Sequence, residues 1–349
     1  MVQVAKRVLS HRLHQAAAAQ LLVALRLPVS REGGRLYEAH HMTEKLFRVL
    51  SLDGGGAKGF YTLGVLREIE AMIGCRLHER FNLIFGSSTG SIITAMLALG
   101  KSVPEVIALY QDHVPTVMKN NSADGRSEAL AELSTTIFGD ALFSDVKTSV
   151  GIVTTKWVIE KPMIFKTHVG QAHGMKGSFV PGFGVRIGDA VQASCSAYPY
   201  FNRKTVVTSS GDNVELIDGG FCANNPTLYA IADATVALGV APENIRVVSL
   251  GCGSYPPPPV NWWKVDYWKH KTPGVQLLQK TLEINTQSME QLRVILYKHI
   301  PTVRISQSFS EPAMATDLFE HDLKKLNILT QRGVQSFAQH EETLRGFLV

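Results

Sequence analysis

The chain has 349 residues, 45% of them hydrophobic and 19% charged, so it can bury a large core as one big domain or two modest ones. Residues 1–41 hold six Lys or Arg against two Glu, whereas the remainder carries 29 basic and 28 acidic residues, so the net charge of +5 lies almost entirely in the first segment. This distribution argues against a partner that is a nucleic-acid polymer. No apolar run reaches the roughly 18 residues that a membrane-spanning helix needs.

Residues 1–41 are rich in Arg and Ala and poor in acidic residues. One interpretation is a functional segment, either an amphipathic surface helix over roughly residues 4–27 or a targeting sequence. The other is a disordered tail or an upstream start, since Met42 would be a natural amino terminus directly before the first strand. Both interpretations remain open, and the second is favoured.

Residues 42–349 alternate apolar strands with amphipathic helices. The pattern predicts strands at residues 46–52, 81–85, 163–169, 206–208, 214–217 and 245–250. It predicts helices at residues 59–73, about 90–99, 103–114, 226–238 (capped by Asn225, with Pro226 first), 274–297 and, with a break, 313–347. Residues 120–125 are expected to form a polar loop and residues 170–184 a glycine-rich connection. This order predicts one α/β domain with a mostly parallel sheet between two helical layers.

The first strand runs into "LSLDGGGAKG", which contains G-x-G-x-x-G at Gly54, Gly56 and Gly59. That spacing is typical of a dinucleotide-binding turn, which also requires an acidic residue at the end of the next strand, about 20 residues further on. The next strand ends instead in Gly86-Ser87-Ser88. A dinucleotide-dependent oxidoreductase therefore remains an alternative with weak support.

The second strand runs into "LIFGSSTGSI", which contains the nucleophile spacing G-x-S-x-G at Gly86, Ser88 and Gly90. Ser87 carries the same hydroxyl and could also act as a nucleophile, but the G-x-S-x-G spacing selects Ser88. The run Gly54-Gly55-Gly56 can turn its amides toward an oxyanion, because no Cβ blocks the required dihedral angles. If the two strands are neighbours, both turns open at the same edge of the sheet.

A serine nucleophile needs a base, and "LIDGGFCANNP" places Asp218 at a strand end before Gly219 and Gly220. Partial desolvation would make this carboxylate a stronger base, although Asp-Gly is more often a plain turn. A Ser–Asp–His triad is the alternative, because four histidines follow Asp218 in the chain: His270, His299, His321 and His340.

The four cysteines form no C-x-x-C pair, which favours free thiols in a reducing compartment and no metal site.

Four stretches in this order resemble the motifs of patatin-like phospholipases, which include plant patatins and calcium-independent and cytosolic phospholipases A2: "DGGGAKG", "GSSTG", "ASCSAYP" and "DGGFCANNP". They cover roughly residues 47–253 and leave a helical C-terminal part at residues 262–349. The resemblance implies a three-layer α/β/α fold with a Ser–Asp dyad that cleaves membrane phospholipids without a cofactor. By position, Ser88 is the nucleophile and Asp218 the general base, and the oxyanion hole comes from Gly54, Gly55 and Gly56. Lys58 either steadies the glycine loop, binds a lipid phosphate or is an exposed structural lysine.

A closer similarity is to bacterial patatin-like effectors of CBASS-type anti-phage defence. It implies activation by a cyclic dinucleotide and a cytoplasmic enzyme acting at the inner face of the membrane. The stretch "VNWWKVDYWKHK" at residues 260–271 suits a bilayer interface or the packing of the tail onto the core. There are two alternatives: an esterase of this fold without a signalling role, and a catalytically silent storage or binding protein.

Overall fold

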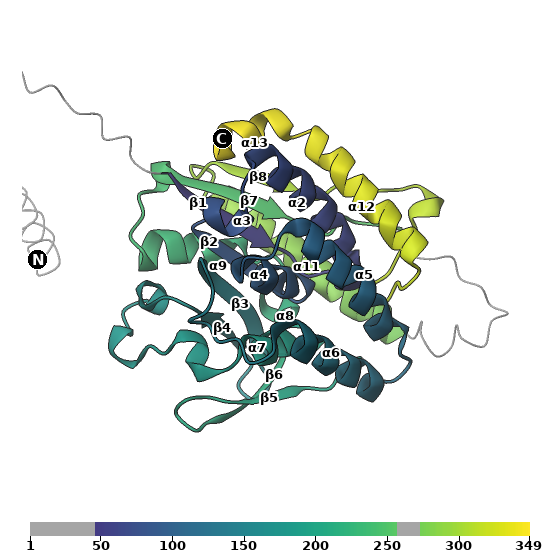
Figure 1. Ribbon diagram of the computed structural model, residues 1–349, viewed down its shortest axis with the longest axis horizontal. Coiled ribbons are helices and arrows are strands. Elements are labelled where there is room, and N and C mark those ends of the chain that lie inside the picture. Colours follow the sequence, from purple (N-terminus) through teal and green to yellow (C-terminus); the bar gives the residue numbers. More distant parts are fainter. Residues whose placement is uncertain (1–45, 257–272) are drawn as a thin grey trace, which may run out of the picture. The chain divides into compact units, whose positions relative to one another are not determined.

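The computed structural model describes residues 46–256 and 273–349 (Figure 1). The predictions for residues 1–41, for the aromatic stretch 260–271 and for His270 fall outside these ranges. Within them, every helix is too short or too polar to cross a bilayer.

An eight-stranded sheet forms the centre of the fold, in the order β5–β6–β3–β2–β1–β7–β8, with β4 also paired to β3 (Figure 1). The parallel strands are β1 (Phe47–Leu52), β2 (Leu83–Ser87), β3 (Ser149–Lys156), β7 (Ile245–Leu250) and β8 (Thr302–Ile305). The antiparallel strands are β4 (Lys161–Lys166), β5 (Lys204–Val207) and β6 (Asn213–Asp218). The predicted mostly parallel α/β sheet is therefore confirmed.

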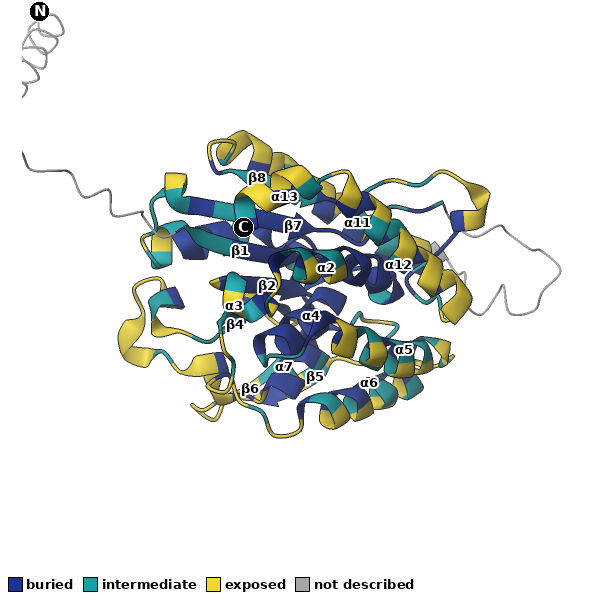
Figure 2. Ribbon diagram, turned by 45° about the horizontal axis from the view of Figure 1, so that its top comes forward, coloured by how far each residue is buried: buried dark blue, intermediate teal, exposed yellow. Residues whose placement is uncertain are grey.

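Helices cover both faces of the sheet (Figure 2). Side chains of the central strands β1, β2, β3 and β7 alternate between two apolar cores. In β1, Leu50 and Leu52 face one core and Val49 faces the other. The larger core packs against α2 (Gly59–Ile73), α3 (Leu77–Arg80), α4 (Thr89–Ala98), α5 (Val103–Lys119), α6 (Ala123–Phe138), α7 (Ile187–Ser194), α12 (Leu323–Ala338) and α13 (Glu341–Leu348). The smaller core packs against α8 (Gly220–Ala223) and α9 (Thr227–Ala232). The result is a three-layer α/β/α sandwich.

The connection predicted at residues 120–125 is shorter than expected, and helix α6 begins inside it at Ala123. The Ser122 hydroxyl accepts a hydrogen bond from the Gly125 amide at 3.0 Å and caps this helix. Asp124 and Gly125, which were expected in the loop, lie in the first turn of this helix. The structure thus corrects the loop prediction, and α6 later supplies one wall of the active-site cavity.

Other elements differ from the predictions in their bounds or their exposure. Strands β3 and β8 and helices α3 and α7 were not predicted. The helix predicted from residue 313 begins only at Leu323, as α12. Helix α9 begins after Pro226 and ends at Ala232 in a π-helical turn. Asn225 does bond the Thr227 amide, at 3.0 Å, but Pro226 is the cap and not the first helical residue. Helix α11 (Pro273–Leu296) has apolar residues at helical spacing along its length, which would predict one buried stripe. Only its first half presents such a stripe, since Leu292 and Leu296 are exposed.

Candidate active site

Strand β3 brings the serine turn and the aspartate turn together. β2 pairs with β3 as far as Ser87, opposite Val153, and β6 pairs with β3 from Asp218, opposite Thr154. Both strands lie on the same side of β3, because β4 occupies the other side along residues 151–156. β2 and β6 run in opposite directions, so their carboxyl ends meet at adjacent positions. Ser88 follows β2 directly and therefore lies beside Asp218.

Ser88 occupies a sharp turn between β2 and α4. Its φ of 51° and ψ of −126° lie in a region that residues other than glycine rarely adopt. The Ser88 amide donates to Ser194 Oγ at 3.0 Å, and the Ser194 hydroxyl donates to the Val153 carbonyl of β3 at 2.6 Å. An added Cβ at Gly90 would lie 2.3 Å from the Leu52 carbonyl oxygen, so α4 can start this close to β1 only with glycine there.

The Asp218 carboxylate is buried and is oriented by two donors. Ser88 Oγ donates to Asp218 Oδ2 at 2.7 Å, and the Gly220 amide donates to Asp218 Oδ1 at 2.7 Å. Burial raises the pKa of Asp218 to about 7, because desolvation of the charge outweighs these two bonds. At neutral pH such a carboxylate is well matched to accept and return a proton.

The glycine loop between β1 and α2 borders the same site. Gly55 and Gly56 line the cavity beside Ser88, and within the described residues neither amide is taken up by another protein group. The Gly54 amide, in contrast, donates to the Asn224 carbonyl at 2.9 Å. Of the three predicted oxyanion glycines, this geometry corrects the first, since its N–H is already bonded. The amides of Gly55 and Gly56 are therefore the two in this loop that remain available to donate to an oxyanion.

The remaining predicted glycines shape the turns around the two reactive side chains. An added Cβ would lie within 3.0 Å of another atom at each of Gly59, Gly86, Gly90, Gly219 and Gly220. Their role is thus steric: they allow strands and helices to approach closely at the carboxyl edge of the sheet.

Lys58 is buried, which contradicts the interpretation as an exposed structural lysine. It lines a cavity of about 20 Å³ together with Cys252 and Glu283 of α11. This position leaves open the two other interpretations, support of the glycine loop or contact with a lipid phosphate.

A buried ion pair anchors the glycine loop, and no sequence motif indicated it. Arg304 on β8 donates to both carboxylate oxygens of Asp53, from Nη1 at 2.9 Å and from Nη2 at 2.5 Å. Arg304 Nη1 also donates to Ser249 Oγ on β7 at 2.8 Å. The partners are 251 residues apart in the chain, so no local pattern relates them. Bidentate pairing of this kind fixes direction as well as distance.

We expect Arg304→Met to destabilise the protein by about 3–5 kcal/mol, because Asp53 would stay buried without its counter-charge. Activity should fall as well, since the glycine loop would lose its anchor. Urea unfolding followed by circular dichroism measures the first effect. Arg345→Met is the matched control: its exposed pair with Glu341 should contribute less than about 1 kcal/mol. An equal effect of the two substitutions would contradict the anchoring role.

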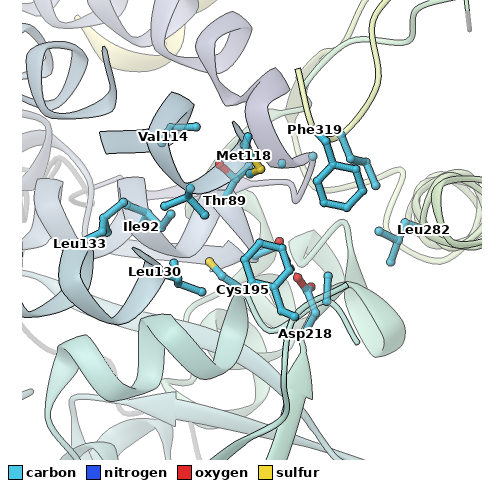
Figure 3. A pocket seen from close by; sticks show the side chains of 17 residues that line it. Thr89, Ile92, Val114, Met118, Leu130, Leu133, Cys195, Asp218, Leu282 and Phe319 are labelled. Atoms are coloured by element: carbon cyan, nitrogen blue, oxygen red, sulfur yellow. Dashed lines mark hydrogen bonds between the residues drawn. The ribbon is translucent and has the colours of Figure 1, made fainter. Parts of the chain in front are cut away.

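The cavity at Ser88 is mostly apolar and small, with a volume of about 50 Å³ (Figure 3). Its polar edge consists of Ser88, Asp218 and the glycine loop. Leu282 of α11 lies on one side of the cavity, together with Leu318 and Phe319. Apolar side chains of α4, α5 and α6 form the opposite wall: Ile92, Val114, Val117, Met118, Leu130 and Leu133. An apolar cavity beside a serine and a carboxylate suits an ester with a hydrocarbon chain.

The alternative catalytic residues, the late histidines and Ser87, are not placed to react in the cavity at Ser88. His299 and His321 are exposed, and His340 bonds the Ser336 carbonyl at the end of α12. None of these three lines the cavity at Ser88. The Ser87 hydroxyl is buried and has no hydrogen-bond partner. Among the described residues, no group of three or more His, Cys, Asp or Glu side chains is placed to hold a metal ion.

Two further residues of the site were not recognised in the sequence. Ser194 lies in the "ASCSAYP" stretch and links the Ser88 amide to β3. Asn224 lies in "DGGFCANNP", and its side-chain amide donates to the Gly54 carbonyl at 3.2 Å and to Thr286 Oγ1 of α11 at 2.7 Å. Both residues lie inside the motif stretches quoted above, so their position in those stretches is the sequence feature that could have identified them.

Comparison with known proteins gives consistent matches. The family model described as patatin-like phospholipase matches residues 50–231, which include the glycine loop, Ser88 and Asp218. A cUMP-AMP-activated phospholipase of Escherichia coli is 61% identical over 307 residues, covering 88% of this chain and 95% of that protein. A cGAMP-activated phospholipase of Vibrio cholerae is 29% identical, covering 56% of this chain and 59% of its own length. Patatin-2-Kuras 4 of Solanum tuberosum is 26% identical, covering 59% of each chain.

Proposed function

Because this chain belongs to the patatin-like phospholipase family, we propose that it hydrolyses fatty-acyl esters of membrane phospholipids through an acyl-enzyme on Ser88. The observation that carries this proposal is the 2.7 Å hydrogen bond from Ser88 Oγ to the buried carboxylate of Asp218, at the edge of an apolar cavity. An acyl chain lies in the apolar part of the cavity, and the ester carbonyl lies between Ser88 and the glycine loop.

In the first half-reaction, Ser88 Oγ attacks the ester carbonyl carbon while Asp218 Oδ2 accepts the hydroxyl proton. The carbonyl oxygen gains negative charge, and the Gly55 and Gly56 amides donate hydrogen bonds to it. Asp218 then returns its proton to the oxygen of the departing lysophospholipid. The products of this step are the alcohol and an ester between the fatty acid and Ser88.

In the second half-reaction, water replaces the alcohol. Asp218 accepts a proton from the water as its oxygen attacks the acyl carbon, and the same amides stabilise the second oxyanion. Collapse of this intermediate releases the fatty acid and returns the proton to Ser88 Oγ. A single carboxylate serves as base in both halves, which its raised pKa supports.

A cyclic dinucleotide activates this hydrolysis, and the enzyme acts at the inner face of the membrane. Support comes from the named relatives, one activated by cUMP-AMP and one by cGAMP. The size of the cavity also supports a resting state: about 50 Å³ holds roughly four water molecules, which is too little for a long acyl chain. We expect the wall of the cavity to move outward when a phospholipid binds.

We expect the purified full chain to release fatty acid from phosphatidylethanolamine–phosphatidylglycerol vesicles faster with micromolar cUMP-AMP than without it, by at least about tenfold. Mass spectrometry of free fatty acid and lysophospholipid measures this directly. Cyclic AMP is the control nucleotide and should leave the rate unchanged. Equal hydrolysis with and without each nucleotide would leave an esterase without this switch, and no hydrolysis under any condition would contradict the enzyme itself.

A further inference from the structure

A second cavity, with a volume of about 380 Å³, lies between β4, the connection 167–184 and α9. It shares no lining residue with the cavity at Ser88. In Figure 1 the connection forms the teal loops beside β4, at the lower left. Its volume lies within the roughly 300–1,000 Å³ that small-molecule sites occupy. The reaction proposed for Ser88 and Asp218 does not use this cavity.

A buried polar network forms one side of this second cavity. Asp233, 1% exposed, begins the π-helical turn Asp233–Ala237 that follows α9. Three side chains that line the cavity donate to its carboxylate: Lys166 Nζ at 2.5 Å, His173 Nε2 at 2.7 Å and Gln171 Nε2 at 3.0 Å. Lys166 neutralises the carboxylate, and the His173 ring remains 39% exposed to the cavity and solvent. π-helical turns are rare and occur often at functional sites.

Backbone strain is concentrated at the same place. In the described part of the chain, four residues other than glycine have a positive φ, and one of them is Ser88. Two of the other three, His173 with φ 47° and Phe183 with φ 54°, line the second cavity. Residues with such a backbone are strained, and strain of this kind clusters at active sites and ligand sites.

The charge and the aromatic lining indicate the ligand class. Of the basic residues in the segment 161–188, Lys166 and His173 line the cavity, and both also bond the buried Asp233 carboxylate. Lys166 Nζ and the 39% exposed His173 ring are the donors that an anionic group in the cavity can reach. Phe179, Phe183 and Tyr229 line the cavity and offer ring faces on which a nucleobase can stack. A ligand that carries both phosphate and a flat base fits this combination.

We propose that this second cavity is the binding site of the cyclic dinucleotide activator. Phosphate oxygens accept hydrogen bonds from His173 and Lys166, and a base stacks on Phe179 and Phe183. The proposal rests on the activation by a cyclic dinucleotide inferred above, and it adds the place and the residues of that activation.

The second cavity is connected to the active site through β3. Gln171 Nε2 donates to the Val150 carbonyl of β3 at 3.1 Å, as well as to Asp233. The same strand holds the Ser88 amide through Ser194 and Val153, as described above. A ligand that reorders the connection 167–184 therefore acts on the strand that aligns Ser88 with Asp218. Such a ligand shifts the population toward whichever arrangement it binds better.

The test is the affinity of the full chain for cUMP-AMP, measured by isothermal titration calorimetry. We expect His173→Asn and Phe179→Ala each to weaken binding by at least about tenfold, through the loss of a charge-assisted bond or of a stacking face. Asparagine tolerates a positive φ, so His173→Asn removes the ring with little backbone penalty. The melting temperature without nucleotide checks that each variant is folded, and if one is not, the other decides.

His299→Asn is the matched control, because His299 is exposed and does not line the second cavity. Weakened binding in the two cavity variants, with wild-type affinity in the control, supports the assignment. Wild-type affinity in both cavity variants overturns it while activation by the nucleotide stands. No binding by the unaltered protein overturns both the site and the activation, and hydrolysis of vesicles then shows separately whether the enzyme assignment survives.

Discussion

Ser88→Ala is expected to lower phospholipid hydrolysis by at least about a thousandfold, because the variant cannot form an acyl-enzyme. Alanine adopts the strained φ of 51° no less easily than serine, and the Ser88 amide still donates to Ser194. The fold should therefore be retained. Product release from vesicles measures the first effect, and labelling with a fluorophosphonate probe shows whether the nucleophile has been lost.

Ser87→Ala is the control for this experiment. Its hydroxyl lies next to Ser88 in the chain, is buried and has no hydrogen-bond partner, so its removal should leave both labelling and hydrolysis near wild-type levels. Turnover retained in Ser88→Ala and lost in Ser87→Ala would reverse the assignment of the nucleophile.

Asp218→Asn is expected to lower kcat by about a hundredfold to ten-thousandfold, since an amide cannot accept the proton of Ser88. In the wild-type enzyme, kcat/KM should fall about tenfold per pH unit below pH 7, where Asp218 becomes protonated. The variant should lose this limb of the profile. Asp112→Asn, an exposed change on α5, is the matched control and should keep the wild-type profile.

The same substitution should also change stability, with a predictable sign. The pKa of Asp218 is raised from 3.8 to about 7 on folding, so its contribution to stability is present below pH 4 and is lost as pH rises to 7. Asparagine carries no charge at any of these pH values. The melting temperature of Asp218→Asn should therefore exceed that of wild type by more at pH 8 than at pH 5. An unchanged difference across this range would contradict the desolvated carboxylate.

Many helices and strands could be predicted from the sequence, because the patterns that define them lie within a few consecutive residues. Helix α2 and strand β7 have the predicted bounds, since apolar periodicity and flanking turn residues define both. Strand β3 was missed although "SVGIVTTK" is rich in β-branched residues, which was a usable signal. The start of helix α6 was predicted as a polar loop, although Ser122 is a residue type that caps helices and accepts a hydrogen bond from the Gly125 amide here.

The sequence by itself determined the chemistry available at each turn: a serine with glycines on both sides, a glycine run before it, and an aspartate at a later strand end. These are properties of a few consecutive residues, so no partner had to be known. The tertiary structure decided which turns meet. β3 places the ends of β2 and β6 at adjacent positions on one side, Arg304 reaches Asp53 across 251 residues, and the Asn224 carbonyl occupies the Gly54 amide. Pairings of this kind depend on strand register and on contacts between distant segments, which no local pattern encodes.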